Sequence, residues 1–144
     1  FHCEDDWEFY EYGFIEKSLE ILLLNDNIFT VWLREYRNFK VVMNGQPVDS
    51  KIINNIYRIL TPFRERTNIW SGFTFNPGLR RLKDCKLFMP YSNYKNSPEC
   101  NCGGVEQALS NLYYNKNYLS AITINDKGYV QHIGWDNPTK REYQ

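Results

Sequence analysis

Hydrophobic and polar residues follow two different spacings along this chain. Over 14–24 the apolar positions recur every three or four residues, which predicts an amphipathic helix that begins after Gly13 and stops at the polar run 25–27. Positions 28–33 are aromatic or β-branched almost throughout, and such a run predicts a buried strand. Because the segment 1–9 also has the character of a strand, we expect a parallel βαβ unit at the start of the chain. The apolar face expected for the helix comprises Phe14, Ile15, Ser18, Leu19, Leu22 and Leu23.

The middle of the chain has a weaker pattern. Residues 39–43 predict a short strand, and the apolar spacing over 52–60 predicts a helix whose caps are Asp49 and Ser50. We interpret 36–68 as an insertion able to cover a cleft.

The second half of the chain alternates strand-like and helical segments. Phe73 and Phe75 alternate with small or polar residues, which predicts a strand. Asn76-Pro77-Gly78 then predicts a turn, because proline fixes φ and glycine accepts a positive φ. A polar, tyrosine-rich loop is expected over 91–104. The remaining expected elements are a helix that opens with Glu106 and has Val105, Leu109, Leu112 and Tyr113 on one face, and strands over 119–124 and 128–133.

Composition limits the class of protein. With 144 residues, of which 42% are hydrophobic and 17% aromatic, we expect a single folded α/β domain over 1–144. The 17 basic residues balance the 17 acidic ones, so no overall field favours nucleic acid or an anionic membrane. No apolar run is long enough to predict a transmembrane segment. The chain opens at Phe1, inside a strand-like segment, and we expect it to be part of a longer protein.

The four cysteines do not form a zinc-binding pattern. Cys100 and Cys102 are close, whereas Cys3 and Cys85 lie far from them in the sequence. A structural zinc site usually combines two such pairs, or one cysteine pair with a histidine pair. We therefore expect mostly free thiols in a reducing compartment.

Three consecutive acids, Glu4, Asp5 and Asp6, lie among apolar and aromatic residues. Ionised carboxylates in such a setting need a compensating partner. On an extended strand Glu4 and Asp6 point to the same side, and two carboxylates at a strand end suit Mg2+ or Mn2+. The same residues also fit a solvated acidic turn.

Four other side chains have both a functional and a structural interpretation. Arg80 and Arg81 follow the turn and suit a phosphate-bearing ligand, or they are surface arginines at a helix start. Glu106 suits a general base aimed into a cleft, or it complements the helix dipole. His132 lies in an apolar setting, where a histidine is more often part of the core than a ligand.

The order of these segments resembles that of bacterial-type family 2 glycosyltransferases of the GT-A fold, from their Asp-x-Asp motif onward. The most specific phrases are Glu-Asp-Asp-Trp-Glu-Phe near the start and Phe-Asn-Pro-Gly-Leu-Arg-Arg in the second half. The phrase His-Ile-Gly-Trp near the end of the chain also takes its place in this order of motifs. The resemblance spans most of the chain and is strongest in 3–34, 70–82 and 129–135.

The resemblance implies a partial, Rossmann-like GT-A sheet flanked by helices, without the N-terminal nucleotide-binding half. It implies that Glu4, Asp5 and Asp6 hold Mn2+ or Mg2+ with His132 as a further ligand. Glu106 takes the place of the catalytic base, although the family's Glu-Asp pair is Glu-Gln here. The residues implied to contact substrate are Trp70, Phe73, Asn76, Arg80, Arg81 and Trp135.

The implied activity is metal-dependent, inverting transfer of a sugar from a nucleotide-sugar donor to a hydroxyl of a carbohydrate or glycolipid acceptor. The implied location is the cytoplasm, including peripheral association with the inner face of the membrane. One alternative is a non-catalytic carbohydrate- or protein-binding domain that kept a degenerate form of the fold. Another is a metal-dependent hydrolase or nuclease that uses the same acids.

Overall fold

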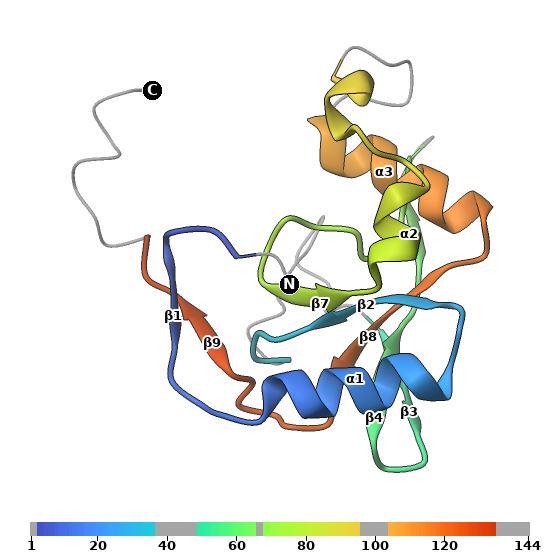
Figure 1. The fold of residues 1–144 in the computed structure, drawn as a ribbon. Coiled ribbons are helices and arrows are strands. Elements are labelled where there is room, and N and C mark those ends of the chain that lie inside the picture. The colour runs from blue at the N-terminus through green and yellow to red at the C-terminus, as the bar shows by residue number, and fades with distance from the viewer. Residues whose placement is uncertain (1–2, 37–48, 66–67, 96–103, 135–144) are drawn as a thin grey trace.

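The computed structural model describes residues 3–36, 49–65, 68–95 and 104–134. Five of its described strands form a mixed sheet in the order β3-β4-β8-β2-β7, so the expected mixed α/β class is confirmed (Figure 1). The strand β2 pairs in parallel with β8 and antiparallel with β7. The five strands are β2 (Ile28–Trp32), β3 (Ser50–Ile53), β4 (Tyr57–Leu60), β7 (Gly78–Arg80) and β8 (Leu119–Thr123).

The helix α1 (Phe14–Leu24) has the expected bounds, but its buried face is rotated from the one expected. Ser18, Ile21 and Leu22 are buried, and Ile21 and Leu22 pack against β2, β7 and β8. Ile15, Leu19 and Leu23 were expected on that face and are exposed instead. The error arises because apolar residues surround most of this helix, so spacing alone does not identify the side that meets the sheet.

The helix α3 (Gly104–Asn115) was expected and carries the expected apolar face. It lies on the opposite side of β2 from α1 (Figure 1). Two short helices, α2 (Leu82–Lys86) and η2 (Tyr91–Tyr94), complete this layer. A register shift between Ile28 and Thr30 allows β2 to direct Phe29 into this cluster while Ile28 and Val31 face α1. The buried cluster here consists of Phe29, Phe73, Phe88, Leu109 and Tyr113.

A separate two-stranded ribbon joins the two ends of the described chain. The strand β1 (Trp7–Phe9) pairs antiparallel with β9 (Val130–His132), with Trp7 opposite His132. The expectation of a parallel βαβ unit is therefore wrong, because β1 pairs with β9 and not in the sheet of β2. The ribbon is attached to the end of β2 by a hydrogen bond from the Tyr129 amide to the Leu33 carbonyl, 2.7 Å long.

The helix expected over 52–60 is also wrong, because these residues form the hairpin β3–β4 at the edge of the main sheet. Asn54 and Asn55 have φ of 50° and 56°, and two successive residues with positive φ make the tight turn that suits a hairpin. Part of the expected insertion 36–68 thus contributes two strands to the sheet. The strand expected at 39–43 lies outside the described residues.

Residues 72–77 are an irregular loop, although a strand was expected at Phe73 and Phe75. Gly72 has φ of 90°, and a Cβ there would lie 2.3 Å from Ser120 Oγ, so this loop depends on glycine. Gly78 begins β7 without the positive φ expected of it. A short hairpin, β5 (Phe63–Glu65) with β6 (Asn68–Trp70), precedes the loop. None of the helices in the described ranges is long and apolar enough to cross a bilayer.

Candidate active site

Asp6 and His132 come from opposite ends of the described chain and meet on the β1–β9 ribbon. Antiparallel pairing sets Trp7 opposite His132, and the Ile133 amide donates to the Asp6 carbonyl at 2.8 Å. Asp6 Oδ2 consequently lies 3.1 Å from His132 Nε2, with side chains that are 23% and 26% exposed. The carboxylate and the imidazole therefore form a partly buried pair.

Three neighbours shape the surroundings of this pair. The Trp7 ring is nearly perpendicular to the His132 ring, with centroids 5.0 Å apart. The guanidinium of Arg34 lies 5.6 Å from the Trp7 ring, and burial lowers the pKa of Arg34. A Cβ on Gly134 would lie 3.0 Å from both Asp6 Oδ2 and His132 Cε1. A Cβ at Gly134, the second residue after β9, would therefore require the pair to shift by a few tenths of an ångström.

Glu4 and Asp5 do not join Asp6 as expected. Both side chains are exposed, and Asp5 and Asp6 form a turn before β1. The expectation that Glu4 and Asp6 project together from an extended strand is therefore wrong. In the part of the chain that the structure describes, no group of three His, Cys, Asp or Glu side chains is arranged to hold a metal ion.

The 3.1 Å separation of Asp6 Oδ2 and His132 Nε2 is that of a direct ion pair or hydrogen bond, and it is also compatible with two neighbouring ligands of one cation. Two adjacent octahedral ligands at about 2.1 Å from a cation lie about 3 Å apart, which matches the observed separation. Mg2+ is commonly held by only one or two carboxylates, with phosphate oxygens of the substrate completing its shell. The mixed oxygen and nitrogen donors of the pair also suit Mn2+.

Glu106 lies in the first turn of α3, and one of its oxygens is anchored. Oε1 accepts hydrogen bonds from Thr74 Oγ1 at 2.9 Å and from the Phe75 amide at 2.5 Å. Oε2 accepts no hydrogen bond from the described residues. The carboxylate is therefore held in one orientation with its second oxygen available. The next residue, Gln107, has a structural contact instead, donating from Nε2 to the Ile69 carbonyl at 3.0 Å.

The two arginines after the turn have different surroundings. Arg80 is half-buried, donates to the Thr74 carbonyl and to Thr30 Oγ1, and lies 5.1 Å from the Phe73 ring. Burial lowers the pKa of Arg80, and the nearby Glu106 carboxylate opposes that shift. Because a guanidinium has five donors, Arg80 keeps N–H groups beyond those two bonds.

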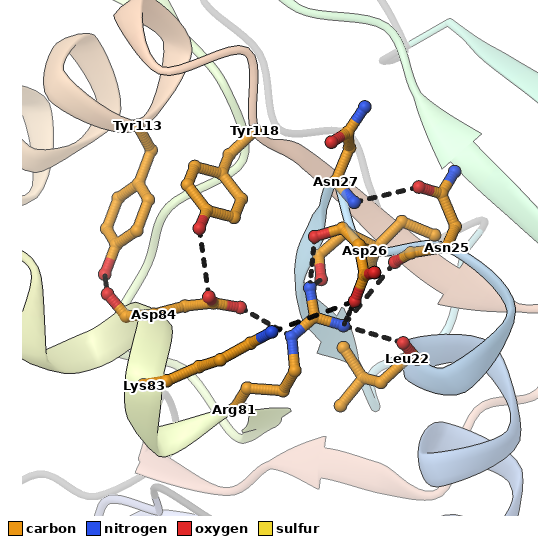
Figure 2. Close-up of polar contacts among 10 residues, drawn as sticks. Leu22, Asn25, Asp26, Asn27, Arg81, Lys83, Asp84, Tyr113 and Tyr118 are labelled. Carbon is orange, nitrogen blue, oxygen red and sulfur yellow. Dashed lines mark hydrogen bonds and ion pairs between the residues drawn. The ribbon is translucent and has the colours of Figure 1, made fainter.

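Arg81 is enclosed by protein acceptors (Figure 2). Its Nε lies 2.7 Å from Asp84 Oδ2, and its Nη1 donates to the Leu22 carbonyl at 2.6 Å. Its Nη2 donates to the carbonyls of Asp26 and Ile28. The guanidinium therefore binds the carboxyl end of α1, where the last carbonyls have no partners within the helix.

The aromatic residues expected to contact substrate differ in exposure. Phe73 is only 2% exposed and stacks against Phe29 and Tyr113, so it offers no ring face to a ligand. Trp70 is half-buried and stacks against Phe63 with ring centroids 5.3 Å apart. Asn76 is half-buried beside Thr74, and Trp135 lies outside the described residues.

A chain of contacts joins the Asp6–His132 pair to the loop that anchors Glu106. Arg34 lies between the rings of Trp7 and Trp32, and Trp32 Nε1 donates to the Gly72 carbonyl at 2.9 Å. The two groups are therefore linked indirectly, through Trp7, Arg34, Trp32 and the loop 72–77.

Sequence reasoning missed Thr74, Gly134 and Arg34. A threonine two residues before an Asn-Pro turn is a recognisable signal for a side-chain-to-backbone bond, and Thr74 Oγ1 indeed accepts from the Asn76 amide at 3.2 Å. The roles of Gly134 and Arg34 depend on pairing between distant segments and have no local signal. Of the cysteines, Cys3 and Cys85 are free thiols, and Cys100 and Cys102 lie outside the described residues.

Comparison with known proteins adds no assignment, since no protein-family model, curated protein or solved structure matches this chain.

Proposed function

We propose that this chain is the C-terminal portion of a metal-dependent, inverting glycosyltransferase with a GT-A-like fold. The observation that carries the proposal is the meeting of Asp6 and His132, 3.1 Å apart although 126 positions separate them in the sequence. The resemblance in motif order implied this partnership of a leading acid with a late histidine, and neither residue's local sequence requires it.

The donor end of the proposed site consists of Asp6 and His132. These residues would hold Mn2+ or Mg2+ together with the diphosphate of a nucleotide-sugar donor. When bound, such a cation neutralises the negative charge that builds up on a departing nucleoside diphosphate. Arg80 is the better placed of the two arginines to assist, because the guanidinium of Arg81 is already occupied by carbonyls and Asp84.

The acceptor end of the proposed site is Glu106. Its oxygen Oε2 takes the proton of an acceptor hydroxyl as that oxygen attacks the anomeric carbon of the sugar, and the bond from that carbon to the diphosphate breaks. The fixed position of Oε1 supports this role, since a general base needs a defined orientation toward the proton it removes. Of the implied substrate-contacting aromatic residues in the described ranges, Trp70 is the half-buried one, and because one face of its ring stacks against Phe63, a sugar would have to meet the other face.

The acceptor is proposed to be a carbohydrate or glycolipid, with the reaction taking place in the cytoplasm or at the inner face of the membrane. The test is turnover of a panel of nucleotide sugars with Mn2+ and a mixture of sugar acceptors. We expect Asp6→Asn to lower turnover at least ~100-fold, the scale on which loss of charge stabilisation in an active site acts.

The matched control is Glu8→Gln. Glu8 also joins β1 to β9 through a side-chain contact, with Gln131 Nε2 at 2.7 Å, but it is exposed and outside the proposed site. This variant should retain full turnover. Activity that persists in Asp6→Asn with excess EDTA would contradict the proposal. Sugar binding without turnover would favour the non-catalytic binding domain, and phosphodiester cleavage without a sugar donor would favour a hydrolase.

A further inference from the structure

Thr74 is a buried residue whose hydroxyl has a defined direction. The hydroxyl accepts from the Asn76 amide at 3.2 Å and lies 2.9 Å from Glu106 Oε1. Because the amide of Asn76 occupies an acceptor position, the single proton of the hydroxyl is left for the carboxylate. Thr74 as a residue is only 8% exposed, so water does not readily replace this bond.

Two donors of different kinds therefore meet at one oxygen of Glu106. The Phe75 amide donates to Oε1 at 2.5 Å, and the Thr74 hydroxyl donates to the same atom. A single donor leaves a carboxylate able to turn about its terminal bond, whereas two donors from adjacent residues of one loop restrict that rotation. Because a carboxylate is a rigid planar group, holding Oε1 in place also fixes the direction in which Oε2 points.

The loop that supplies these donors is itself fixed by backbone contacts. Arg80 donates to the Thr74 carbonyl, and Trp32 Nε1 donates to the Gly72 carbonyl at 2.9 Å. Both bonds use backbone oxygens, so they persist when the side chain of Thr74 is changed. A substitution at Thr74 can therefore remove the hydroxyl without changing the shape of the loop.

We propose that Thr74 is a positioning residue that fixes Glu106 so that Oε2 faces the acceptor hydroxyl, an inference that rests on the function proposed above. Thr74 contacts no reacting atom and acts only through the Glu106 carboxylate. Outer residues that orient a functional group in this way typically change activity by about 10- to 100-fold when removed.

The test compares Thr74→Val, which keeps the shape and removes the hydroxyl, with Thr74→Ser, which keeps the hydroxyl. We expect Thr74→Val to lower kcat by about 10- to 100-fold, with the KM for the donor and acceptor changed by less than about twofold. Thr74→Ser should recover most of kcat. A Thr74→Val enzyme with unchanged kcat, or a Thr74→Ser enzyme as slow as Thr74→Val, would overturn the inference.

A second measurement needs no turnover. The carbon-13 signal of the Glu106 carboxyl, assigned by its absence in Glu106→Gln, reports the hydrogen bonds at that group. We expect this signal to move in Thr74→Val and to stay near the wild-type position in Thr74→Ser. An unmoved signal in Thr74→Val would overturn the inference. If the wild-type protein transfers no sugar and the signal still moves, the proposed function fails while the positioning of Glu106 by Thr74 stands.

Discussion

At the scale of single residues, the candidate site depends on how closely backbone and side chains approach around Asp6 and His132. The pair is brought together by the β1–β9 register, and the backbone of Gly134 lies against both side chains. The acids themselves were predictable from the sequence as a candidate cation site, because carboxylates among aromatic residues need compensation. That Asp6, and not Glu4 or Asp5, meets His132 was not predictable, because it depends on the turn that precedes β1.

We expect Gly134→Ala to weaken binding of Mn2+ by about tenfold, because the added Cβ would lie 3.0 Å from Asp6 Oδ2 and His132 Cε1 and push the pair apart. Isothermal titration with Mn2+ in the presence of a nucleoside diphosphate measures the change. Gly13→Ala is the control: its Cβ would meet no atom within 4 Å, and its φ of 80° makes alanine strained there, so this variant reports general strain without a clash at the pair. Equal Mn2+ affinity in Gly134→Ala and the wild type would contradict the predicted role of Gly134 in shaping the cation site.

Two tyrosines with raised pKa values, the buried Tyr113 and the half-buried Tyr118, predict how stability depends on pH. Burial raises the pKa of Tyr113 well above its ordinary value of 10.0, and burial and the hydrogen bond to Asp84 raise the pKa of Tyr118. Above pH 10 the unfolded chain releases these protons while the folded protein retains them, so the free energy of unfolding falls as pH rises. Below pH 10 both states keep the protons and this contribution is constant.

For Tyr113 we expect the free energy of unfolding to fall by up to about 1.4 kcal/mol per pH unit above pH 10, with a smaller contribution of the same sign from Tyr118. Urea unfolding at pH 8, 10 and 11 measures the slope. Tyr118→Phe should make the slope shallower without changing its sign. Stability that stays constant from pH 9 to pH 11 would contradict the burial of these hydroxyl groups.

At the scale of elements, Arg81 connects α1, α2 and the start of β2. Its guanidinium binds carbonyls at the end of α1 and at Ile28, while Asp84 completes the network with Tyr118 (Figure 2). The helices α1 and α3 and the strands β2 and β8 were predictable, because their apolar spacing or their β-branched and aromatic runs are local signals. The partner of β1 was not, since strand pairing is decided by contacts between distant segments.

The hairpin β3–β4 shows a second limit of predicting elements from the spacing of apolar residues. The spacing of Ile52, Ile53, Ile56 and Leu60 fits a helix face, yet Asn54 and Asn55 both have positive φ and reverse the chain. Asparagine tolerates this conformation better than most residues, so the Asn-Asn pair was the signal that favoured a hairpin over the helix.

We expect Arg81→Met to lower the free energy of unfolding by about 3 kcal/mol, because it leaves Asp84 buried without its cationic partner. Urea unfolding at pH 7 provides the measurement. Lys83→Met is the matched control, since Lys83 lies 3.8 Å from the exposed Asp26 and should matter by less than about 0.5 kcal/mol. Similar losses in the two variants would mean that the network around Arg81 does not stabilise the fold.

At the scale of the whole molecule, the two candidate groups lie on different elements and are linked indirectly, through Trp7, Arg34, Trp32 and the loop 72–77. The ribbon β1–β9 carries Asp6 and His132, and the loop 72–77 anchors Glu106. The fold class followed from the alternation of helical and strand-like segments. The assembly of the site required the structure, because it joins the first and last described segments of the chain to each other.

The most direct test of this account is the effect of Mn2+ on the imidazole signal of His132 in the proton NMR spectrum, assigned with His132→Gln. With a nucleoside diphosphate present, the account predicts that Mn2+ broadens this signal in the wild-type protein and in Glu8→Gln, and leaves it sharp in Asp6→Asn. A signal that stays sharp in the wild type, or that broadens equally in Asp6→Asn, would contradict the claim that Asp6 and His132 together form a cation site.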